Sequence, residues 1–227
     1  MKKKIIVSVL CLALLIFSIN IYAEAEGDNK GPNFWLGRTI ISQLNNKSSR
    51  SDENIIYAKG KDIEITEKEL NNHAARLINA GGREREEAYK EAYDTIVRRK
   101  TLLHAALQAG YKVSDGELDQ IIEKEKENLQ DPDVKEQAEE LYEGFGGEEA
   151  YWEYIREIKR ETAICSKYIN EKEKEYREAH EDEELISYGE DGSIHDAWEE
   201  EKEKLIQQLI EEQQIERGRK KSCVFGK

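Results

Sequence analysis

The stretch from Glu84 to Asp119 constrains the fold of this chain more than any other part of the sequence. Its apolar residues recur at spacings of three and four, so they fall on one face of a long helix. These residues are Tyr89, Ala92, Tyr93, Ile96, Val97, Leu103 and Leu107. Gly110 is predicted to end the helix, because glycine takes the left-handed conformation without steric cost. Since so long an apolar face is unstable in water, other helices are expected to cover it.

Further helices are predicted on both sides of this stretch. Before it, Ile55–Ala58 and Ile63–Ile65 form a small hairpin, and Thr66 caps a helix that Gly81 and Gly82 end. After it, Ser114–Glu117 is a capping box that opens the next helix, and Asp131-Pro132 opens another. A fifth helix begins near Glu148 and continues past Asn170 as a charged, solvated extension. Residues 188–193 are expected to form a loop before a final helix near Ile194.

Composition supports an all-α fold with charged, solvated helix surfaces. Charged residues make up 37% of the chain, only two prolines are present, and strand-like alternation is almost absent. The formal net charge is −14, and phosphate binding needs a basic surface, so nucleic acid is excluded as an expected partner. The same acidity argues against binding to an anionic membrane surface.

The first 25 residues have the features of a signal peptide. Lys2–Lys4 form a basic segment, Ile5–Phe17 an apolar segment, and Ala23-Glu24-Ala25 a cleavage pattern. The protein is therefore expected to be exported and extracytoplasmic. The alternative is an uncleaved membrane anchor, because Ile5–Ala23 is nearly long enough to cross a bilayer.

The rest of the chain is expected to divide into three parts. Residues 26–54 form a polar linker with one apolar segment at 34–44, either a short helix opened by Pro32 that packs on the domain or a segment at the membrane surface. Residues 55–216 form the helical domain, and 217–227 a basic tail. Export permits a disulfide between Cys165 and Cys223, but Cys165 is better interpreted as a small buried apolar residue.

No catalytic, cofactor or metal site is predicted. The four histidines (His73, His104, His180 and His195) show no helical ligand spacing, and 187–198 lacks the acidic end positions of an EF-hand loop. The sequence contains no recognisable nucleophile motif and no phosphate-binding glycine loop.

Aromatic residues are the remaining candidates for a binding site. They gather at the junction of the fourth and fifth predicted helices, as Tyr142, Phe145, Tyr151, Trp152 and Tyr154. One interpretation is ordinary core packing. The other is a peptide-binding groove, since aromatic rings offer large contact area at small entropic cost, and Gly144, Gly146 and Gly147 would let the junction open.

The order of these motifs resembles the N-terminal chaperone module of SurA-like and PrsA-like exported foldases. The matching features are the hairpin with Thr66, Gly110 followed by Val113-Ser-Asp-Gly-Glu-Leu118, and Phe145-Gly-Gly-Glu-Glu149 before Tyr151 and Trp152. The resemblance covers 55–169, and the final helix matches the one that closes the module in this family. It implies a multi-helix chaperone domain with a small N-terminal hairpin and a C-terminal closing helix.

The chain departs from this family between the fifth and the final helix. The foldases usually carry a parvulin-type prolyl isomerase domain there, whereas only the highly charged residues 171–193 intervene in this chain. The resemblance therefore implies a holdase for unfolded exported polypeptides that is not an enzyme. The alternatives are a degenerate prolyl isomerase and a structural cell-envelope protein.

Overall fold

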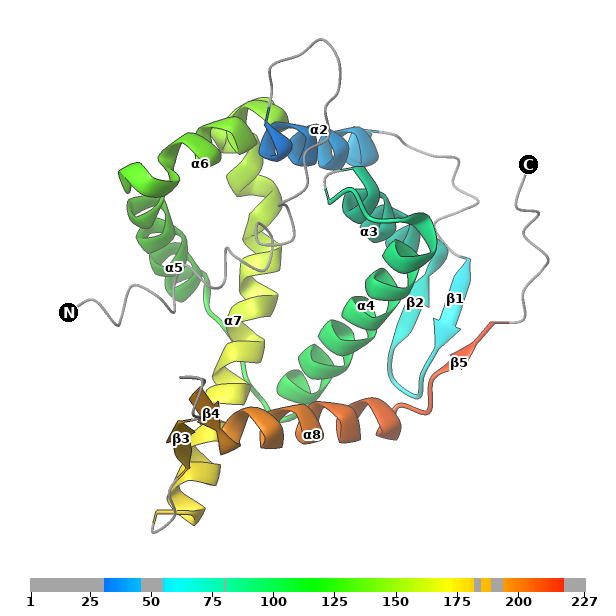
Figure 1. Cartoon of the computed structure of the whole chain (residues 1–227), viewed down its shortest axis with the longest axis vertical. Coiled ribbons are helices and arrows are strands. Elements are labelled where there is room, and N and C mark those ends of the chain that lie inside the picture. The colour runs from blue at the N-terminus through cyan, green and yellow to red at the C-terminus, as the bar shows by residue number, and fades with distance from the viewer. Residues whose placement is uncertain (1–30, 46–54, 80, 182–184, 189–193, 219–227) are drawn as a thin grey trace. The chain divides into compact units, whose positions relative to one another are not determined.

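The computed structural model describes residues 31–45, 55–79, 81–181, 185–188 and 194–218. The predicted signal peptide, 1–25, lies outside these residues, as does Cys223. The helices are α2 (Pro32–Asn45), α3 (Glu67–Asn79), α4 (Arg85–Gln108), α5 (Asp115–Asn128), α6 (Pro132–Phe145), α7 (Glu148–Ala179) and α8 (Ala197–Glu212). The strands are β1 (Ile56–Lys59), β2 (Glu64–Thr66), β3 (Ile186–Tyr188), β4 (Ile194–Asp196) and β5 (Glu216–Arg217) (Figure 1). The predicted all-α fold with a small hairpin is confirmed.

Helix α4 ends and α5 begins as the sequence predicts. Gly110 has a φ of 88°, and the N–H groups of Gly110 and Tyr111 donate to the carbonyls of Leu107 and Ala106. This is the paired hydrogen bonding of a Schellman turn. At Ser114 the side chain accepts from the N–H of Glu117, whose carboxylate accepts from the Ser114 N–H at 2.9 Å, so the capping box is complete.

The buried face of α4 differs from the predicted one near the end of the helix. Leu107 is 47% exposed, whereas Ala106 is fully buried. Thr101 is only 1% exposed although its side chain is polar. Helical spacing selects candidate apolar faces, but the neighbouring elements decide which side of the last turns is covered, and here they cover Thr101 and Ala106.

The described chain forms two compact units. Among the described residues, the first contains 31–45, 55, 67–79, 81–94 and 114–159, and the second contains 56–66, 95–113, 160–181, 185–188 and 194–218. Helices α4 and α7 each supply residues to both units. Each unit buries its own set of apolar side chains, such as Leu70, Leu118 and Ile155 in the first and Ile65, Ile164 and Ile206 in the second.

In the first unit, α2 packs against α6 at a pair of glycines. A Cβ on Gly37 would lie 2.8 Å from the carbonyl oxygen of Leu141, and a Cβ on Gly144 would collide with the carbonyl oxygen of Phe34. The two backbones therefore approach where only glycine fits (Figure 1). This packing buries Leu36 and Ile40, which confirms the interpretation of 34–44 as a helix that packs on the domain.

Polar contacts join α2 to α3 in the same unit. The Gln43 side chain donates to the carbonyl of Asn72 at 3.1 Å and accepts from Nε of Arg76 at 3.3 Å. Helix α3 begins directly after Thr66, as predicted, and Gly82, with a φ of 61°, lies in the turn that follows it.

In the second unit, a three-stranded sheet has the order β2-β1-β5 with antiparallel neighbours. The predicted hairpin is confirmed, and it buries Ala58 and Ile65 completely. Strand β5 was not predicted. It pairs Arg217 with Ala58 across the sheet, a long-range contact that a two-residue strand cannot reveal in the sequence.

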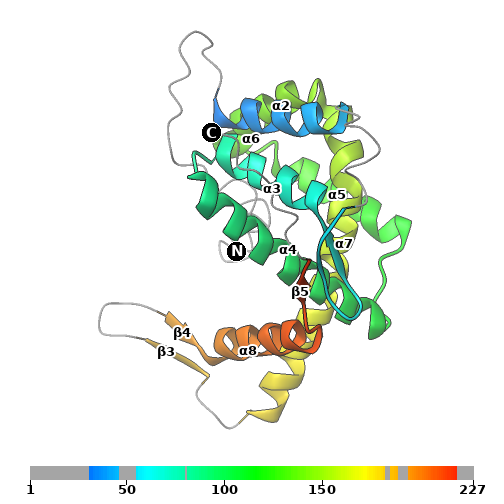
Figure 2. The same cartoon turned by 90° about the vertical axis from the view of Figure 1, so that its right-hand side faces the viewer.

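Strands β3 and β4 correct the sequence-based expectation for 186–196. They form an antiparallel pair that leads into α8, so Ile194–Asp196 is a strand where the first turn of a helix was expected, and the strand β3 includes Tyr188 (Figure 2). The rest of the expected loop, 189–193, lies outside the described residues. Helix α8 begins at Ala197 because Asp196 caps it, accepting from the N–H of Trp198 at 3.0 Å. Arg177 on α7 fixes Asp196 by donating to its carboxylate at 2.8 Å.

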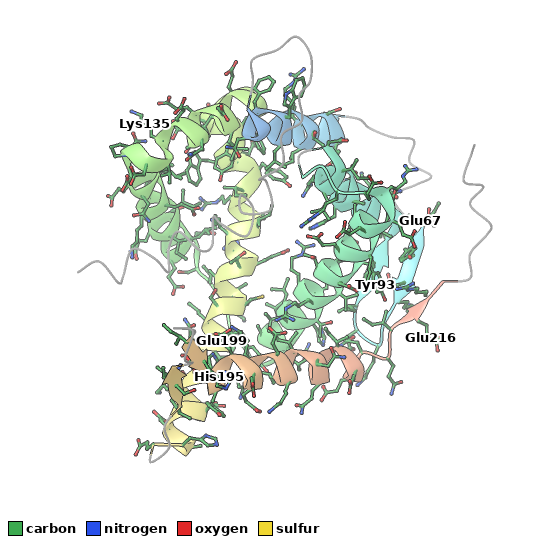
Figure 3. All side chains as sticks on the ribbon, viewed as in Figure 1. Glu67, Tyr93, Lys135, His195, Glu199 and Glu216 are labelled. Atoms are coloured by element: carbon green, nitrogen blue, oxygen red, sulfur yellow. The ribbon has the colours of Figure 1, made fainter. Side chains whose placement is uncertain are left out.

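Helix α8 belongs to the second unit and contacts both α7 and α4 there. Its Trp198 is buried beside the ring of Tyr176 on α7, with 5.7 Å between centroids. Farther along, Glu203 receives two hydrogen bonds from the guanidinium of Arg98 on α4, one of them 2.7 Å long. Charged side chains cover the outer surfaces of the helices, as Figure 3 shows for Lys135, which is exposed on α6.

The glycine pair between α2 and α6 provides a test of the first unit. Gly144→Ala places a methyl group against the backbone of α2, so we expect it to lower the free energy of unfolding by about 1–3 kcal/mol or more, as overpacking does. Gly116→Ala is the matched control, because a Cβ there points into open space on helix α5. That change should be neutral or stabilising by up to about 1 kcal/mol. Equal effects of the two changes in chemical denaturation would contradict the close packing.

Candidate functional site

The five predicted peptide-binding residues come together in the first unit, at the junction of α6 and α7. We call Tyr142, Phe145, Tyr151, Trp152 and Tyr154 the aromatic cluster. The ring centroids of Tyr142 and Tyr151 are 5.1 Å apart, those of Phe145 and Tyr151 5.3 Å, and those of Tyr151 and Trp152 4.9 Å. Edge-on and tilted pairs at these distances are favourable, so the rings form one packed group around Tyr151.

The members of the aromatic cluster differ in exposure. Phe145 and Tyr151 are each 3% exposed and Trp152 is 8% exposed, whereas Tyr142 and Tyr154 are half-buried. Only the last two offer part of their rings to a ligand in this conformation. The three buried rings would have to be uncovered before they contacted a bound peptide.

The glycines beside the aromatic cluster have specific backbone roles. Gly144 lies against the backbone of α2, as described above. Gly146 caps α6 in the left-handed conformation with a φ of 86°, and Gly147 follows with a φ of 138°, which other residues rarely adopt. These requirements explain why glycines adjoin large side chains here without any opening of the junction.

Charged groups border the aromatic cluster. Lys159 on α7 is buried and forms an ion pair with Glu125 on α5 at 2.5 Å. Lys126 lies over the ring of Trp152 at 5.6 Å, and Arg76 over the ring of Tyr154 at 6.0 Å. Cations over aromatic faces are attracted by the ring quadrupole, so α3 and α5 both hold the cluster electrostatically.

Burial suppresses ionisation of the cluster's tyrosines. Burial, with the nearby carboxylates of Glu148 and Glu125, raises the pKa of Tyr142 to about 12. Burial and Glu125 also raise the pKa of Tyr151 above its ordinary value. Both phenols therefore stay protonated at physiological pH and serve as hydrogen-bonding and packing groups, with no role as bases.

A cavity of about 640 Å³ lies in the second unit, away from the predicted site residues. We call it the Thr101 cavity, because Thr101 of α4 lines it. The turn between β1 and β2 contributes Lys61 and Asp62, α7 contributes Tyr168, and α8 contributes Leu209. Its volume is in the range of small-molecule pockets.

Hydrogen bonds fix the framework of the Thr101 cavity. Gln213, which is buried after the end of α8, accepts from the N–H of Lys61 through its carbonyl at 2.7 Å and from the N–H of Asp62 through its side chain at 2.9 Å. On another side the rings of Tyr111 and Tyr168 meet edge-on, with 5.8 Å between centroids. The cavity wall is therefore positioned by α8, α7 and the hairpin together.

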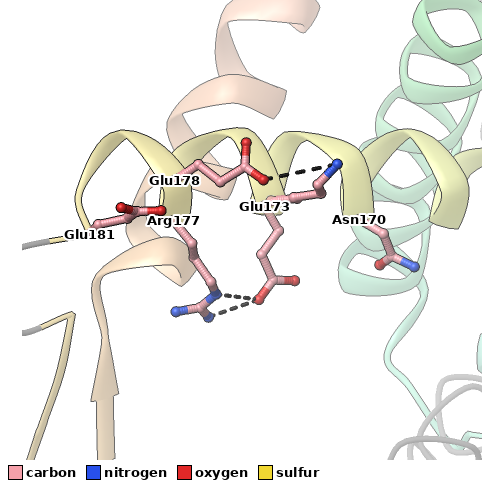
Figure 4. A pocket seen from close by; sticks show the side chains of 6 residues that line it. Asn170, Glu173, Arg177, Glu178 and Glu181 are labelled. Carbon is pink, nitrogen blue, oxygen red and sulfur yellow. Dashed lines mark hydrogen bonds and ion pairs between the residues drawn. The ribbon is translucent and has the colours of Figure 1, made fainter.

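A second hollow, on the charged extension of α7, contains paired charges. Figure 4 shows Arg177 bonded to Glu173 and Glu178 paired with the neighbouring lysine, and the first of these contacts is 2.8 Å long. Asn170 and Glu181 complete the lining. These ion pairs lie on the extension of α7 that the sequence predicted to be solvated. That prediction holds for only part of the extension, because Arg177 also binds Asp196 and Tyr176 packs against Trp198 of α8.

The described residues give little support for a metal site, a cysteine nucleophile or a membrane-spanning helix. Within them, no three His, Cys, Asp or Glu side chains are grouped so that they could hold a metal ion. Burial, with the carboxylate of Glu161 beside it, raises the pKa of the free Cys165 thiol to about 11, so this cysteine is not an activated nucleophile. No helix in the described part of the chain is both long enough and apolar enough to cross a membrane.

Sequence reasoning missed Thr101, Lys159 and Glu125. Thr101 had a detectable signal, because it lies four residues after Val97 in the gap before Leu103 of the apolar face. A hydroxyl at such a position marks a polar group that folding buries. Lys159 and Glu125 had no such signal, since each resembles the many charged residues of neighbouring helix surfaces.

The buried ion pair predicts a large asymmetry between single and double changes. Lys159→Met should lower the free energy of unfolding by about 3–5 kcal/mol, because it leaves Glu125 charged and unpaired in a buried site. Adding Glu125→Leu should recover most of the loss. Lys135→Met, at an exposed pair with Glu139, is the control and should cost less than about 1 kcal/mol. Additive losses in the double variant, measured by chemical denaturation, would contradict a buried pair.

The raised pKa of Tyr142 predicts alkaline destabilisation. Between the ordinary tyrosine pKa of about 10 and the folded value of about 12, the unfolded chain loses the phenol proton while the folded chain keeps it. The free energy of unfolding should therefore fall as pH rises through this window. In Tyr142→Phe the fall should be smaller, as measured by denaturant titrations at pH 9 and pH 11. An identical fall in both proteins would show that Tyr142 is not shielded.

Comparisons of the chain with protein-family models, curated proteins and solved structures found no match. The resemblance to SurA-like and PrsA-like foldases therefore depends on the ordered residues of this chain alone. Those residues form the expected local structures, from the hairpin through the Gly110 turn and the Ser114 cap to the junction at Phe145.

Proposed function

We propose that this protein is an exported, chaperone-like holdase that binds unfolded polypeptides on their way out of the cell. It shields exposed apolar segments reversibly and uses no nucleotide or metal. Its partners are unfolded or partly folded exported chains, and its N-terminal segment is a signal peptide or a membrane tether. This function places the protein outside the cytoplasm, either secreted or at the outer face of the cytoplasmic membrane.

The observation that carries this proposal is the order of elements along the chain. Three features occur in the order that the foldase resemblance implies: the hairpin before α3, the glycine turn between α4 and the capped α5, and the aromatic start of α7. Helix α8 closes the second unit after a short connection. The absence of room for an isomerase domain in 171–193 supports holding without isomerisation.

The half-buried rings of Tyr142 and Tyr154 support a contact surface for clients on the first unit. An aromatic ring at the surface provides apolar contact with few rotatable bonds, which suits transient binding of varied segments. The buried rings of Phe145, Tyr151 and Trp152 hold these two in place. The acidic surface, with a formal charge of −14 for the whole chain, would keep a client complex soluble.

An aggregation-suppression assay separates the holdase from a structural cell-envelope protein. A denatured client of net negative charge is diluted from guanidinium into buffer with the purified chain, and light scattering is followed. A negative client is needed because the acidic chain would attract a basic one without specific binding. We expect scattering to fall in proportion to the chain added, whereas an equally acidic inert protein should have no effect. Unchanged scattering at a several-fold excess of the chain would contradict the proposal.

Substitutions on the aromatic cluster test where clients bind. Tyr142→Ala combined with Tyr154→Ala should weaken suppression several-fold, because these rings are the accessible ones. Tyr89→Ala, at another half-buried tyrosine of the first unit, is the matched control and should leave suppression unchanged. Trp152→Ala should mainly lower stability, by about 3–5 kcal/mol, as buried aromatic truncations do. Full suppression by a folded double variant would exclude the aromatic cluster as the client surface.

A prolyl-peptide assay tests the remaining alternative, a degenerate isomerase. With only 171–193 between α7's buried part and β4, we expect no acceleration of prolyl isomerisation by the purified chain. Acceleration that persists through repurification would favour the isomerase over a simple holdase.

A further inference from the structure

We propose that the β3–β4 hairpin of the second unit binds residues 219–227 of a second copy of this chain, so that two copies associate through two reciprocal contacts. Such pairing is independent of the holdase function proposed above. An open strand edge, two exposed isoleucines and an acidic surrounding sequence suit the hairpin to a basic, extended partner segment. Residues 219–227 have that composition.

The outer edges of the hairpin are open. Strands β3 and β4 form a two-stranded sheet, and no further strand of the described residues pairs with either of them. The N–H of Ala197 donates to the carbonyl of Leu185, so the alternation of an antiparallel pair directs the N–H and C=O of Ile186 away from β4. Outward backbone groups along an exposed strand are a template for another extended segment. A two-stranded hairpin alone is marginally stable in water, so an added strand would also stabilise it.

Two isoleucines give the hairpin an exposed apolar face. Ile186 is 42% exposed and Ile194 is 69% exposed, which is the largest fraction for any large apolar residue in the described part of the chain. The register pairs Ile186 with Asp196, so Ile186 and Ile194 are diagonal neighbours on the same face of the pair. In strand addition, backbone hydrogen bonds hold the added segment and apolar side chains select it, and this hairpin offers both.

The charge of the sequence around the hairpin selects a basic partner. Residues 181–201 contain Asp or Glu at ten positions and neither Lys nor Arg. Two cations from outside this stretch offset only part of the charge, since Arg177 pairs with Asp196 and Lys202 with Glu199. A segment that carries basic residues is therefore attracted to the hairpin, whereas an acidic segment is repelled.

Residues 219–227 complement this surface in charge and in apolar character. Their sequence, Arg-Lys-Lys-Ser-Cys-Val-Phe-Gly-Lys, contains four cations and no acidic residue. Val224 and Phe225 are adjacent apolar residues of high strand propensity. Basic side chains and an apolar pair thus occur within one short segment, as the acidic hairpin with its exposed isoleucines requires.

The segment comes from a second copy because it is too short to reach the hairpin of its own copy. Helix α8, with 16 residues, has β4 at its start and β5 beyond its end, as Figures 1 and 2 both show. A helix of this length spans about 24 Å. Six residues of fully extended chain from Gly218 to Val224 cover at most about 22 Å. In a pair of copies, each copy provides one hairpin and one segment, so both contacts form together.

Sedimentation velocity of the full chain over a concentration series tests this association, in reducing buffer so that no disulfide contributes. We expect a monomer–dimer equilibrium that weakens as salt is added, because the contacts join opposite charges. Ile186→Ser should weaken dimerisation about 10-fold or more, and so should Val224→Ser combined with Phe225→Ser, since each lost apolar contact occurs twice in the dimer. Ile55→Ser is the matched control, because Ile55 in the first unit is also 42% exposed, and it should leave dimerisation unchanged.

A mixture of the two variants distinguishes reciprocal exchange from other causes of association. The Ile186→Ser copy keeps an intact segment 219–227, and the copy with the changed segment keeps an intact hairpin, so the mixture can form one of the two contacts. We expect mixed dimers that are weaker than the wild-type dimer but tighter than either variant with itself. Cooperative melting of each variant checks that it is folded.

Three results would overturn the proposal. A wild-type chain that stays monomeric at every concentration has no such contact. A dimer that is lost with Ile186→Ser but kept when Val224 and Phe225 are changed would mean that the hairpins pair with each other, and it would exclude 219–227 as the partner segment. A mixture that dimerises no better than the separate variants would exclude reciprocal exchange. Each of these results leaves the aggregation-suppression assay unaffected, so the holdase and the dimer contact stand or fall separately.

Discussion

The end of α4 at Gly110 is the constraint on which the second unit depends. Glycine allows the left-handed turn there, and the residues that follow are held by α7. Arg160 donates to the carbonyl of Val113 at 3.1 Å, and Lys167 donates to that of Lys112 at 2.9 Å. Tyr111 packs against Tyr168 in the same stretch. Backbone N–H groups of residues 109–111 satisfy the carbonyls of the last turn of α4, and side chains of α7 satisfy two carbonyls of the connection that follows.

The two units bury their apolar side chains in different ways. The first unit brings α2 and α6 together at Gly37 and Gly144, where the backbones touch, and fills the space beside them with aromatic rings. The second unit contains the three-stranded sheet and α8, a partly open cavity of about 640 Å³, and the buried hydroxyl of Thr101, which has no hydrogen-bond partner among the described residues. Close packing indicates a structural role for the glycine pair of the first unit.

This contrast changes which residues are the best candidates for function. The sequence directed attention to the aromatic cluster, because large apolar side chains beside glycines resemble a flexible groove. In the structure, Gly144 is required by the close approach of α2 and Gly146 by the left-handed end of α6, and three of the five rings are buried. Only Tyr142 and Tyr154 keep partly exposed rings for a client. The Thr101 cavity of the second unit contains none of these five residues, and both polar and apolar side chains line it.

The sequence by itself determined the local structure of this protein. Signals that act within a few residues predicted the helices, their ends and the β1–β2 hairpin. These signals are helical spacing, the glycine after α4, the capping boxes and the proline at α6. Only the tertiary structure decided what lies side by side: β5 against β1, the β3–β4 pair, Lys159 against Glu125, and the exposure of Leu107 beside the buried Ala106. These depend on contacts between residues far apart in the chain, where a charged side chain or a two-residue strand gives no local sign of its partner. The same reason explains why an ordinary threonine on a helix became a buried residue whose hydroxyl has no partner among the described residues.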